Sequence, residues 1–130
     1  VGERSGRRDA DGKRGLIDDG RIEDAERLRE DALALEQAGA CLLVLEMVPA
    51  SLAVKITDAL KACHTIGIGA GCGTAGQVLV LHDMLGMKIG RTPRFVKDFL
   101  AQTGSIEGAF AAYVAEVKTR SFPVDEVHGF

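Results

Sequence analysis

The apolar run Ala-Cys-Leu-Leu-Val-Leu at residues 40–45 constrains the fold of this chain more than any other feature. A short run without polar residues is typical of a parallel β-strand that is covered on both faces. Residues at helical spacing precede the run and stop at Gly39, which suits the position just after a helix. Pro49 suits the first turn of a second helix, which we expect to reach Lys61. The order of helix, buried strand and helix predicts a βα repeat.

The repeat continues along the chain. A second strand is expected at His64–Ile68, a full helix and two tight loops after the first. Residues Gln77–Leu81 fit either a third strand or the first turn of a helix, and their periodicity does not decide between the two. Two further helices are expected to begin at Pro93 and at Ser105. This alternation indicates an α/β fold with a parallel sheet, although so few strands cannot close a barrel, which takes eight.

The expected helices carry apolar stripes, which predict that each buries one face. The first of them begins near Arg21, with Asp18 or Asp19 available as its cap. The stripes are Ile22, Ala25, Leu28, Ala32 and Leu35 in the first helix, Leu52, Ile56 and Leu60 in the second, and Ile106, Ala109, Phe110, Tyr113, Val114 and Val117 in the last.

Composition excludes several classes of protein. A hydrophobic content of 46% with 27% charged residues is ordinary for a globular domain and excludes disorder of the whole chain. The net charge of -3 supplies no positive field for nucleic acid or an anionic membrane, so small molecules and protein surfaces are the expected partners. No apolar stretch approaches the roughly 20 residues that span a bilayer, and the opening residues 1–8 lack the apolar region of a secretory signal. These features predict a cytoplasmic protein.

The two ends of the chain are expected to lie outside its folded part. Residues 1–19 balance basic and acidic side chains with almost nothing to bury, so we expect a flexible polar segment. The folded region is placed at 20–123, followed by a C-terminal tail at 124–130. The first residue is Val rather than Met, which fits a fragment, a processed chain or an unusual start.

The cysteines indicate neither a disulfide framework nor a zinc site. There are three of them, Cys41, Cys63 and Cys72, and no two have Cys-x-x-Cys spacing. We expect three reduced thiols, with Cys41 filling space in the core.

Glu46 is the strongest candidate for a catalytic residue. It is a lone carboxylate at the end of the first buried strand, and the carboxyl ends of strands build the active sites of β/α folds. Walled by Leu45, Met47 and Val48, it would be partly desolvated and suited to act as a general base. Alternatively, a glutamate at a strand end simply turns to solvent or caps the following helix.

Other motifs carry weaker signals. Gly71, Gly73 and Gly76 form a G-x-G-x-x-G pattern after a strand, but no acidic residue ends a following strand about 20 residues later, so a tight substrate-facing loop is favoured over dinucleotide binding. His82-Asp83 fits a helix start or loop better than an acid/base pair. No metal is assigned to His64 or His128, which lack ligand-spaced partners, and Arg91, Arg94 and Lys97 are expected on a solvated helix face.

Several longer motifs together resemble the ketopantoate hydroxymethyltransferase family. Their order and spacing match over about Gly20 to Pro123. The motifs are Leu43-Val-Leu-Glu-Met-Val-Pro49, Ile66-Gly-Ile-Gly-Ala-Gly71, Gly76-Gln-Val-Leu-Val-Leu-His-Asp-Met-Leu-Gly86, Pro93-Arg-Phe-Val-Lys97, Tyr113-Val-Ala-Glu-Val-Lys118 and Phe122-Pro123.

The resemblance implies the C-terminal half of a (β/α)8 barrel. The family transfers a hydroxymethyl group from 5,10-methylenetetrahydrofolate to 3-methyl-2-oxobutanoate, giving ketopantoate on the route to pantothenate and coenzyme A. It implies that Mg2+ binds the keto acid and that the glutamate matching Glu46 removes the C3 proton. The magnesium ligands of the family lie on earlier strands and nothing in residues 1–19 resembles them, so we expect no activity from this chain alone. It further implies a homo-oligomer or a complementing N-terminal half as partner.

This chain departs from the family at two places, and other functions stay open. Ala75 stands where the family usually has Asp, and Cys63-His64 where it usually has Ile-Pro, which puts the loop after the second strand in doubt. One alternative is another magnesium-dependent carbon–carbon lyase or transferase on the same barrel. The other is a non-catalytic half-barrel that serves in assembly.

Overall fold

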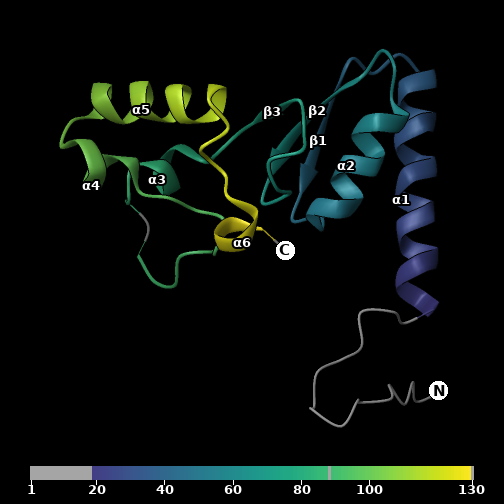
Figure 1. Ribbon diagram of the computed structural model, residues 1–130, viewed down its shortest axis with the longest axis horizontal. Helices are drawn as coiled ribbons and strands as arrows, with labels where there is room; N and C mark the ends of the chain where they lie inside the picture. Colours follow the sequence, from purple (N-terminus) through teal and green to yellow (C-terminus); the bar gives the residue numbers. More distant parts are fainter. Residues whose placement is uncertain (1–18, 88, 130) are drawn as a thin grey trace, which may run out of the picture.

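The computed structural model describes residues 19–87 and 89–129, and the predicted segment 1–19 lies almost wholly outside this part (Figure 1). Helices and parallel strands alternate in it, which confirms the predicted α/β class. The elements are α1 (Asp19–Gln37), β1 (Leu42–Glu46), α2 (Ala50–Ala59), β2 (His64–Ile68), β3 (Gly76–Gln77), α3 (Leu81–Met84), α4 (Phe99–Thr103), α5 (Ile106–Lys118) and α6 (Asp125–His128).

The three strands form one parallel sheet in the order β1-β2-β3. Leu42 pairs with His64 and Glu46 with Ile68, so the two longer strands end at the same level. The bounds of β2 match the prediction, and β1 begins and ends slightly later than the apolar run. Both readings of Gln77–Leu81 hold in part, because β3 ends at Gln77 and α3 begins at Leu81.

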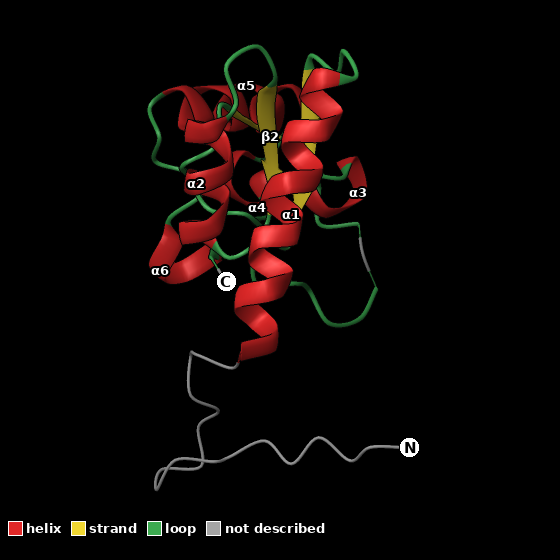
Figure 2. Ribbon diagram, turned by 90° about the vertical axis from the view of Figure 1, so that its right-hand side faces the viewer, coloured by secondary structure: helices red, strands yellow, loops and turns green. Residues whose placement is uncertain are grey.

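Helices α1 and α2 cover one face of β1 and β2, and Figure 2 shows both helices in front of β2. The two helices contact each other and share one aliphatic core with β1. We call this core the sheet cluster. Its buried members are Ala32, Leu45, Val48, Ala53, Ile56, Leu60, Cys63 and Ala70.

The opposite face of β1 is open to solvent. Leu42 and Val44 are 60% and 59% exposed. The prediction that this strand is covered on both faces is therefore wrong for the described chain, because both neighbouring helices pack on the same side. Residues two apart share a face of a strand, so Glu46 lies on the open face with Leu42 and Val44.

The ends of α1 and α2 follow their local signals. Gly39 has φ 99°, and Ala40 N–H donates to Leu35 O at 3.0 Å, which is the predicted glycine stop after α1. Pro49 is the N-cap of α2 and not its first helical residue. The predicted stripe of α1 is buried only in part, since Ala32 is 3% exposed whereas Ile22 and Leu35 are 53% and 46% exposed.

The second core is aromatic and lies beyond β2. Rings of Phe99 and Phe122 meet edge-to-face with centroids 5.4 Å apart, and Tyr113 meets Phe99 in the same way at 5.5 Å. We call this core the aromatic cluster. Its buried members are Ile68, Leu79, Met84, Leu85, Phe95, Phe99, Ala109 and Phe122.

Two predictions for this region need correction. No helix begins at Pro93: α4 begins at Phe99, because the Asp98 side chain caps it by accepting the Ala101 N–H at 2.9 Å. Helix α5 does begin after Ser105, which accepts the Gly108 N–H at 3.0 Å. Its apolar stripe is wider than the surface that packs on the aromatic cluster. The side chains left exposed are Ile106, Phe110 and Val114.

Candidate functional site

Glu46 is the last residue of β1, as the sequence predicts, and its side chain is exposed. The next residue continues the strand pairing, since Met47 N–H donates to Ile68 O at 2.9 Å. Met47 then turns the chain with φ 52° toward Pro49 and α2. The expected desolvation of Glu46 is not found: Met47 is 54% exposed, and the buried Leu45 and Val48 belong to the sheet cluster on the other face.

The loop of residues 69–75 follows the end of β2 and packs against α2. A Cβ added to Gly71, which has φ 78°, would lie 2.6 Å from Ala50 Cβ, and one added to Gly73 would overlap Val54. The chain then enters β3 at Gly76 and not a helix. The loop therefore lacks the helix N-terminus that holds a pyrophosphate, in agreement with the preference for a tight loop over a dinucleotide site.

Hydrogen bonds from three directions fix this loop. Asp125 Oδ1 in α6 accepts the Cys72 N–H at 2.8 Å. Gln77 Nε2 donates to Gly71 O at 2.8 Å, and Ala75 N–H donates to Thr65 Oγ1 at 3.2 Å. Burial, and next the charge of Asp125, raise the pKa of the Cys72 thiol. The loop beside the end of β2 is therefore bonded to α6, β2 and β3.

The two departures from the family pattern lie at the sheet and not at Glu46. Ala75 has an exposed side chain, and only its backbone N–H is used to hold the loop. Cys63 is 5% exposed and belongs to the sheet cluster, and His64 begins β2 with its side chain exposed. Both positions are compatible with the parallel pairing of β2.

The other residues considered from the sequence lie in a short helix or bind neighbouring segments of the chain. His82 is exposed and Asp83 half-buried in the single turn of α3, where consecutive side chains point about 100° apart. Arg94 is not on a helix face, contrary to the prediction: its guanidinium donates to Glu126 O and Val127 O. Lys97 likewise precedes α4 and pairs with Glu116 at 2.6 Å.

His128 has a role that the sequence does not indicate. Its Nδ1 accepts the Val124 N–H at 3.0 Å, and its ring lies 5.0 Å from the Phe122 centroid. Burial, and next the positive charge of Lys97, lower the pKa of His128. The neutral imidazole therefore fastens α6 to the aromatic cluster.

Glu36 is a second carboxylate whose role the sequence does not indicate. Its Oε1 accepts the N–H groups of Lys61, Ala62 and Cys63 at 2.8, 2.7 and 2.9 Å. These bonds, led by that from Ala62, lower the pKa of Glu36. The partners lie 25 to 27 residues along the chain, so no local pattern could have found them. Glu36 orders the turn that leads into β2.

Residues 19–87 and 89–129 contain no group of three or more His, Cys, Asp or Glu side chains that could hold a metal ion. Magnesium binds through several oxygen ligands, of which carboxylates are the usual protein contribution. Glu46 brings one carboxylate to the ends of the strands, and so the part of the chain that is described does not by itself fit a magnesium site. In the same part, no helix is long and apolar enough to cross a membrane.

Comparison with known proteins identifies the family. The family model described as ketopantoate hydroxymethyltransferase matches residues 15–125. The chain is 61% identical over 112 residues to the 3-methyl-2-oxobutanoate hydroxymethyltransferase of Paracidovorax citrulli (strain AAC00-1), covering 85% of this chain and 38% of that protein. It is 64% identical over 106 residues to that of Verminephrobacter eiseniae (strain EF01-2), covering 82% and 35%.

A third relative is similar to the same extent. The 3-methyl-2-oxobutanoate hydroxymethyltransferase 1 of Zymomonas mobilis subsp. mobilis is 59% identical over 112 residues, with 85% of this chain and 37% of the relative covered. The chain thus spans little more than a third of the length of the relatives it matches. With a strand-end glutamate in a Leu-Glu-Met-Val-Pro motif and a family match over most of its residues, the chain belongs to the ketopantoate hydroxymethyltransferase family.

Proposed function

We propose that this chain supplies the Glu46-bearing part of an enzyme that transfers a hydroxymethyl group from 5,10-methylenetetrahydrofolate to 3-methyl-2-oxobutanoate, giving 2-dehydropantoate. The observation that carries the proposal is the position of Glu46 at the end of a parallel strand, on the open face of the sheet. The relatives of this chain are named for that transfer to 3-methyl-2-oxobutanoate, and they support the choice of reaction.

A (β/α)8 barrel is the fold that we infer for the complete enzyme. The strands lie in chain order, and the helices before and after β1 pack on the same face of the sheet. With right-handed crossovers, helices on one face make every strand step in the same direction, whereas a doubly wound sheet places helices on both faces. This winding supports a barrel whose second half is formed by residues 20–123, preceded by the segment 1–19 and followed by residues 124–130, of which α6 packs on the aromatic cluster.

Glu46 acts in this proposal as the general base. Its carboxylate accepts the proton from C3 of the keto acid, and the electron pair left on C3 forms the new bond to the one-carbon unit. Covering the open face of the sheet would exclude water from around Glu46 in the complete enzyme. Because the described residues do not fit a magnesium site, we assign magnesium ligands to a complementing N-terminal half and derive no step from the ion.

We expect the isolated chain to self-associate and to show no turnover. Leu42, Val44 and Met47 are each more than half exposed, and β1 has a single neighbour in the sheet that is described. Unpaired strand edges and exposed apolar faces promote association with another chain. Light scattering of the purified chain should show a species larger than a monomer. A compact monomer that binds no hydrophobic dye would contradict this expectation.

Joining this chain to the N-terminal part of a relative tests the assignment of Glu46. We expect the chimera to exchange the C3 proton of 3-methyl-2-oxobutanoate with deuterated water, which can be followed by NMR. Glu46→Gln should lower the exchange rate by roughly 10²–10⁴-fold, the usual contribution of a positioned base, with little change in keto-acid affinity.

Glu30→Gln is the matched control, because Glu30 is an exposed carboxylate in α1, a helix that packs on the face of the sheet opposite Glu46. It should leave the exchange rate unchanged. An active chimera in which Glu46→Gln exchanges protons at the full rate would show that Glu46 is not the base. A folded chimera that binds no keto acid would instead favour the half-barrel that serves in assembly.

A further inference from the structure

Two cysteines lie side by side where β1 and β2 begin, although they are 22 positions apart in the sequence. Cys41 immediately precedes β1 and Cys63 immediately precedes β2. The register pairs Leu42 with His64, and His64 N–H donates to Cys41 O at 2.9 Å. This bond belongs to the Leu42–His64 pair, and continuing the same register back by one residue places Cys41 opposite Cys63.

This placement brings the two Cα atoms into the range that a disulfide spans. Neighbouring strands lie about 4.8 Å apart, and the Cα atoms of bridged cysteines lie about 4.4–6.8 Å apart. Opposite residues of parallel strands project to the same side of the sheet. The thiol of Cys63 is buried in the sheet cluster, and Cys41 shares its side with Leu43 and Leu45 by the two-residue period of β1. The negative charge of a Cys41 thiolate is one of the causes that raise the pKa of Cys63, after burial and Glu36, which agrees with their closeness.

We propose that Cys41 and Cys63 form a redox-active pair that closes a disulfide across the starts of β1 and β2 when the chain meets a small-molecule disulfide such as oxidised glutathione. This goes beyond the hydroxymethyl transfer and does not depend on it. The expectation of three reduced thiols describes the chain before such an oxidant acts.

The exposures of the two thiols set the order of the steps. Cys41 is exposed, so the prediction that it fills space in the core is wrong, and it meets the oxidant first. Its thiolate attacks one sulfur of the small disulfide, which releases one thiolate and leaves a mixed disulfide on Cys41. Cys63 then gives up its proton to solvent, and its thiolate attacks the Cys41 sulfur and expels the second small thiolate. Two electrons pass from the protein thiols to the oxidant. The second step is the slow one, because Cys63 is 5% exposed and carries a raised pKa.

The surrounding structure already holds the two segments together. Glu36, at the end of α1, binds the backbone N–H groups that lead into β2, including that of Cys63. Closing the disulfide therefore requires little movement of the backbone. The third cysteine, Cys72, lies beyond the other end of β2, where its N–H is bound by Asp125, and serves as an internal control.

Oxidation of the folded full chain by oxidised glutathione tests the proposal. The titre of free thiols should fall from three per chain to one, and the mass of the intact chain should fall by about 2 Da as two hydrogens are lost. Peptide mapping should join the segment that contains Cys41 to the segment that contains Cys63. Cys72→Ser should give the same cross-link, whereas Cys41→Ser and Cys63→Val should each abolish it.

The exposed position of Cys41 keeps the test decisive even if Cys63→Val fails to fold, because Cys41→Ser removes no buried group. Three results would overturn the proposal: an unchanged thiol titre in the folded chain, a bond that includes Cys72, or disulfides only between separate chains through Cys41. Reducing the cross-link with dithiothreitol should restore all three thiols.

Discussion

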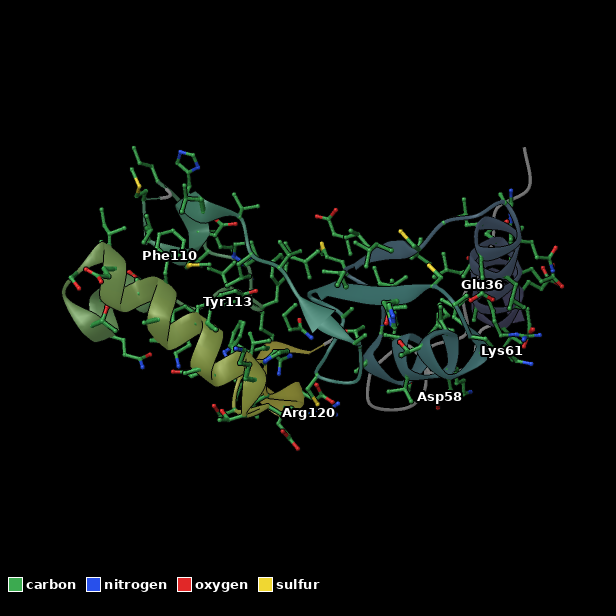
Figure 3. The ribbon with its side chains drawn as sticks, turned by 90° about the horizontal axis from the view of Figure 1, so that it is seen from above. Glu36, Asp58, Lys61, Phe110, Tyr113 and Arg120 are labelled. Atoms are coloured by element: carbon green, nitrogen blue, oxygen red, sulfur yellow. The ribbon has the colours of Figure 1, made fainter. Side chains whose placement is uncertain are left out.

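The sheet cluster and the aromatic cluster hold their parts of the molecule together in different ways. The sheet cluster joins α1, α2 and β1 with small and aliphatic side chains and uses Glu36 to fix a turn. The aromatic cluster joins α4, α5 and the C-terminal residues with interlocking rings. Figure 3 shows Glu36 and Lys61 at one end of the molecule and Tyr113 at the other, with the strands between. Because the two cores share little beyond β2 and the loop after it, we expect them to respond separately to perturbation.

Removing a ring from the aromatic cluster should have the largest effect. Phe99 is fully buried and meets two other rings, so Phe99→Ala should lower the free energy of unfolding by about 3–5 kcal/mol. Hydrogen exchange should accelerate at the amides of α5 and much less at those of α2. Phe110→Ala is the control, because Phe110 lies in α5 but is 42% exposed, and it should change stability by less than about 1 kcal/mol. Equal acceleration in both helices would show that the two clusters unfold as one unit.

Truncating a side chain at the centre of the sheet cluster should destabilise that cluster and not the aromatic one. Ile56 in α2 is fully buried, so Ile56→Ala should lower the free energy of unfolding by about 2–5 kcal/mol. Hydrogen exchange should accelerate at the amides of α2 and β1 and much less at those of α5. Val54→Ala changes a residue of the same helix that is 39% exposed and should cost much less. An effect of Ile56→Ala confined to α5 would break the comparison.

Acid should destabilise the two clusters in different pH ranges. We expect this loss of stability to be smaller than that caused by Phe99→Ala or by Ile56→Ala. The pKa of His128 is lowered from 6.5, so the folded state resists protonation that the unfolded state accepts, and stability is lost as the pH falls below about 6.5. The groups facing His128 are Lys97, Arg94, Glu116 and the Val124 N–H, of which the two cations oppose its protonation. The pKa of Glu36 is lowered from 4.5, so the sheet cluster should lose stability only as the pH falls below about 4.5.

Amide exchange of α6 and of the turn before β2, followed from pH 7.5 to about 3, separates these two steps. His128→Asn keeps a hydrogen-bond acceptor near the Val124 N–H but cannot be protonated in this range, so it should remove the upper step and leave the lower one. An upper step that persists in His128→Asn would assign the loss of stability to another group.

The elements that the sequence predicted well have signals carried by their own residues. The bounds of β2, the stop at Gly39 and the start of a helix at Ser105 all depend on neighbours within a few positions. The helix expected at Pro93 was wrong for a related reason: proline suits a helix start, but Asp98 offers a side-chain cap and α4 begins there.

The features that escaped prediction depend on distant parts of the chain. Whether Val44 is covered depends on which helices pack on that face of the sheet. The sequence of an apolar strand does not show whether one face or both faces are covered. The bonds of Glu36 and the pairing of β1 with β2 join residues more than 20 positions apart. For the candidate site, the position of Glu46 at a strand end could be predicted, but its exposure could not.

The short helix α6 has a consequence for how binding and protonation affect each other. Asp125 holds the loop beside the end of β2, and His128, within the same helical turn, rests on the ring of Phe122. A ligand that displaced the loop would pull on α6 and so alter the proton affinity of His128. Thermodynamic reciprocity then requires that protonation of His128 alter the affinity for that ligand by the same factor.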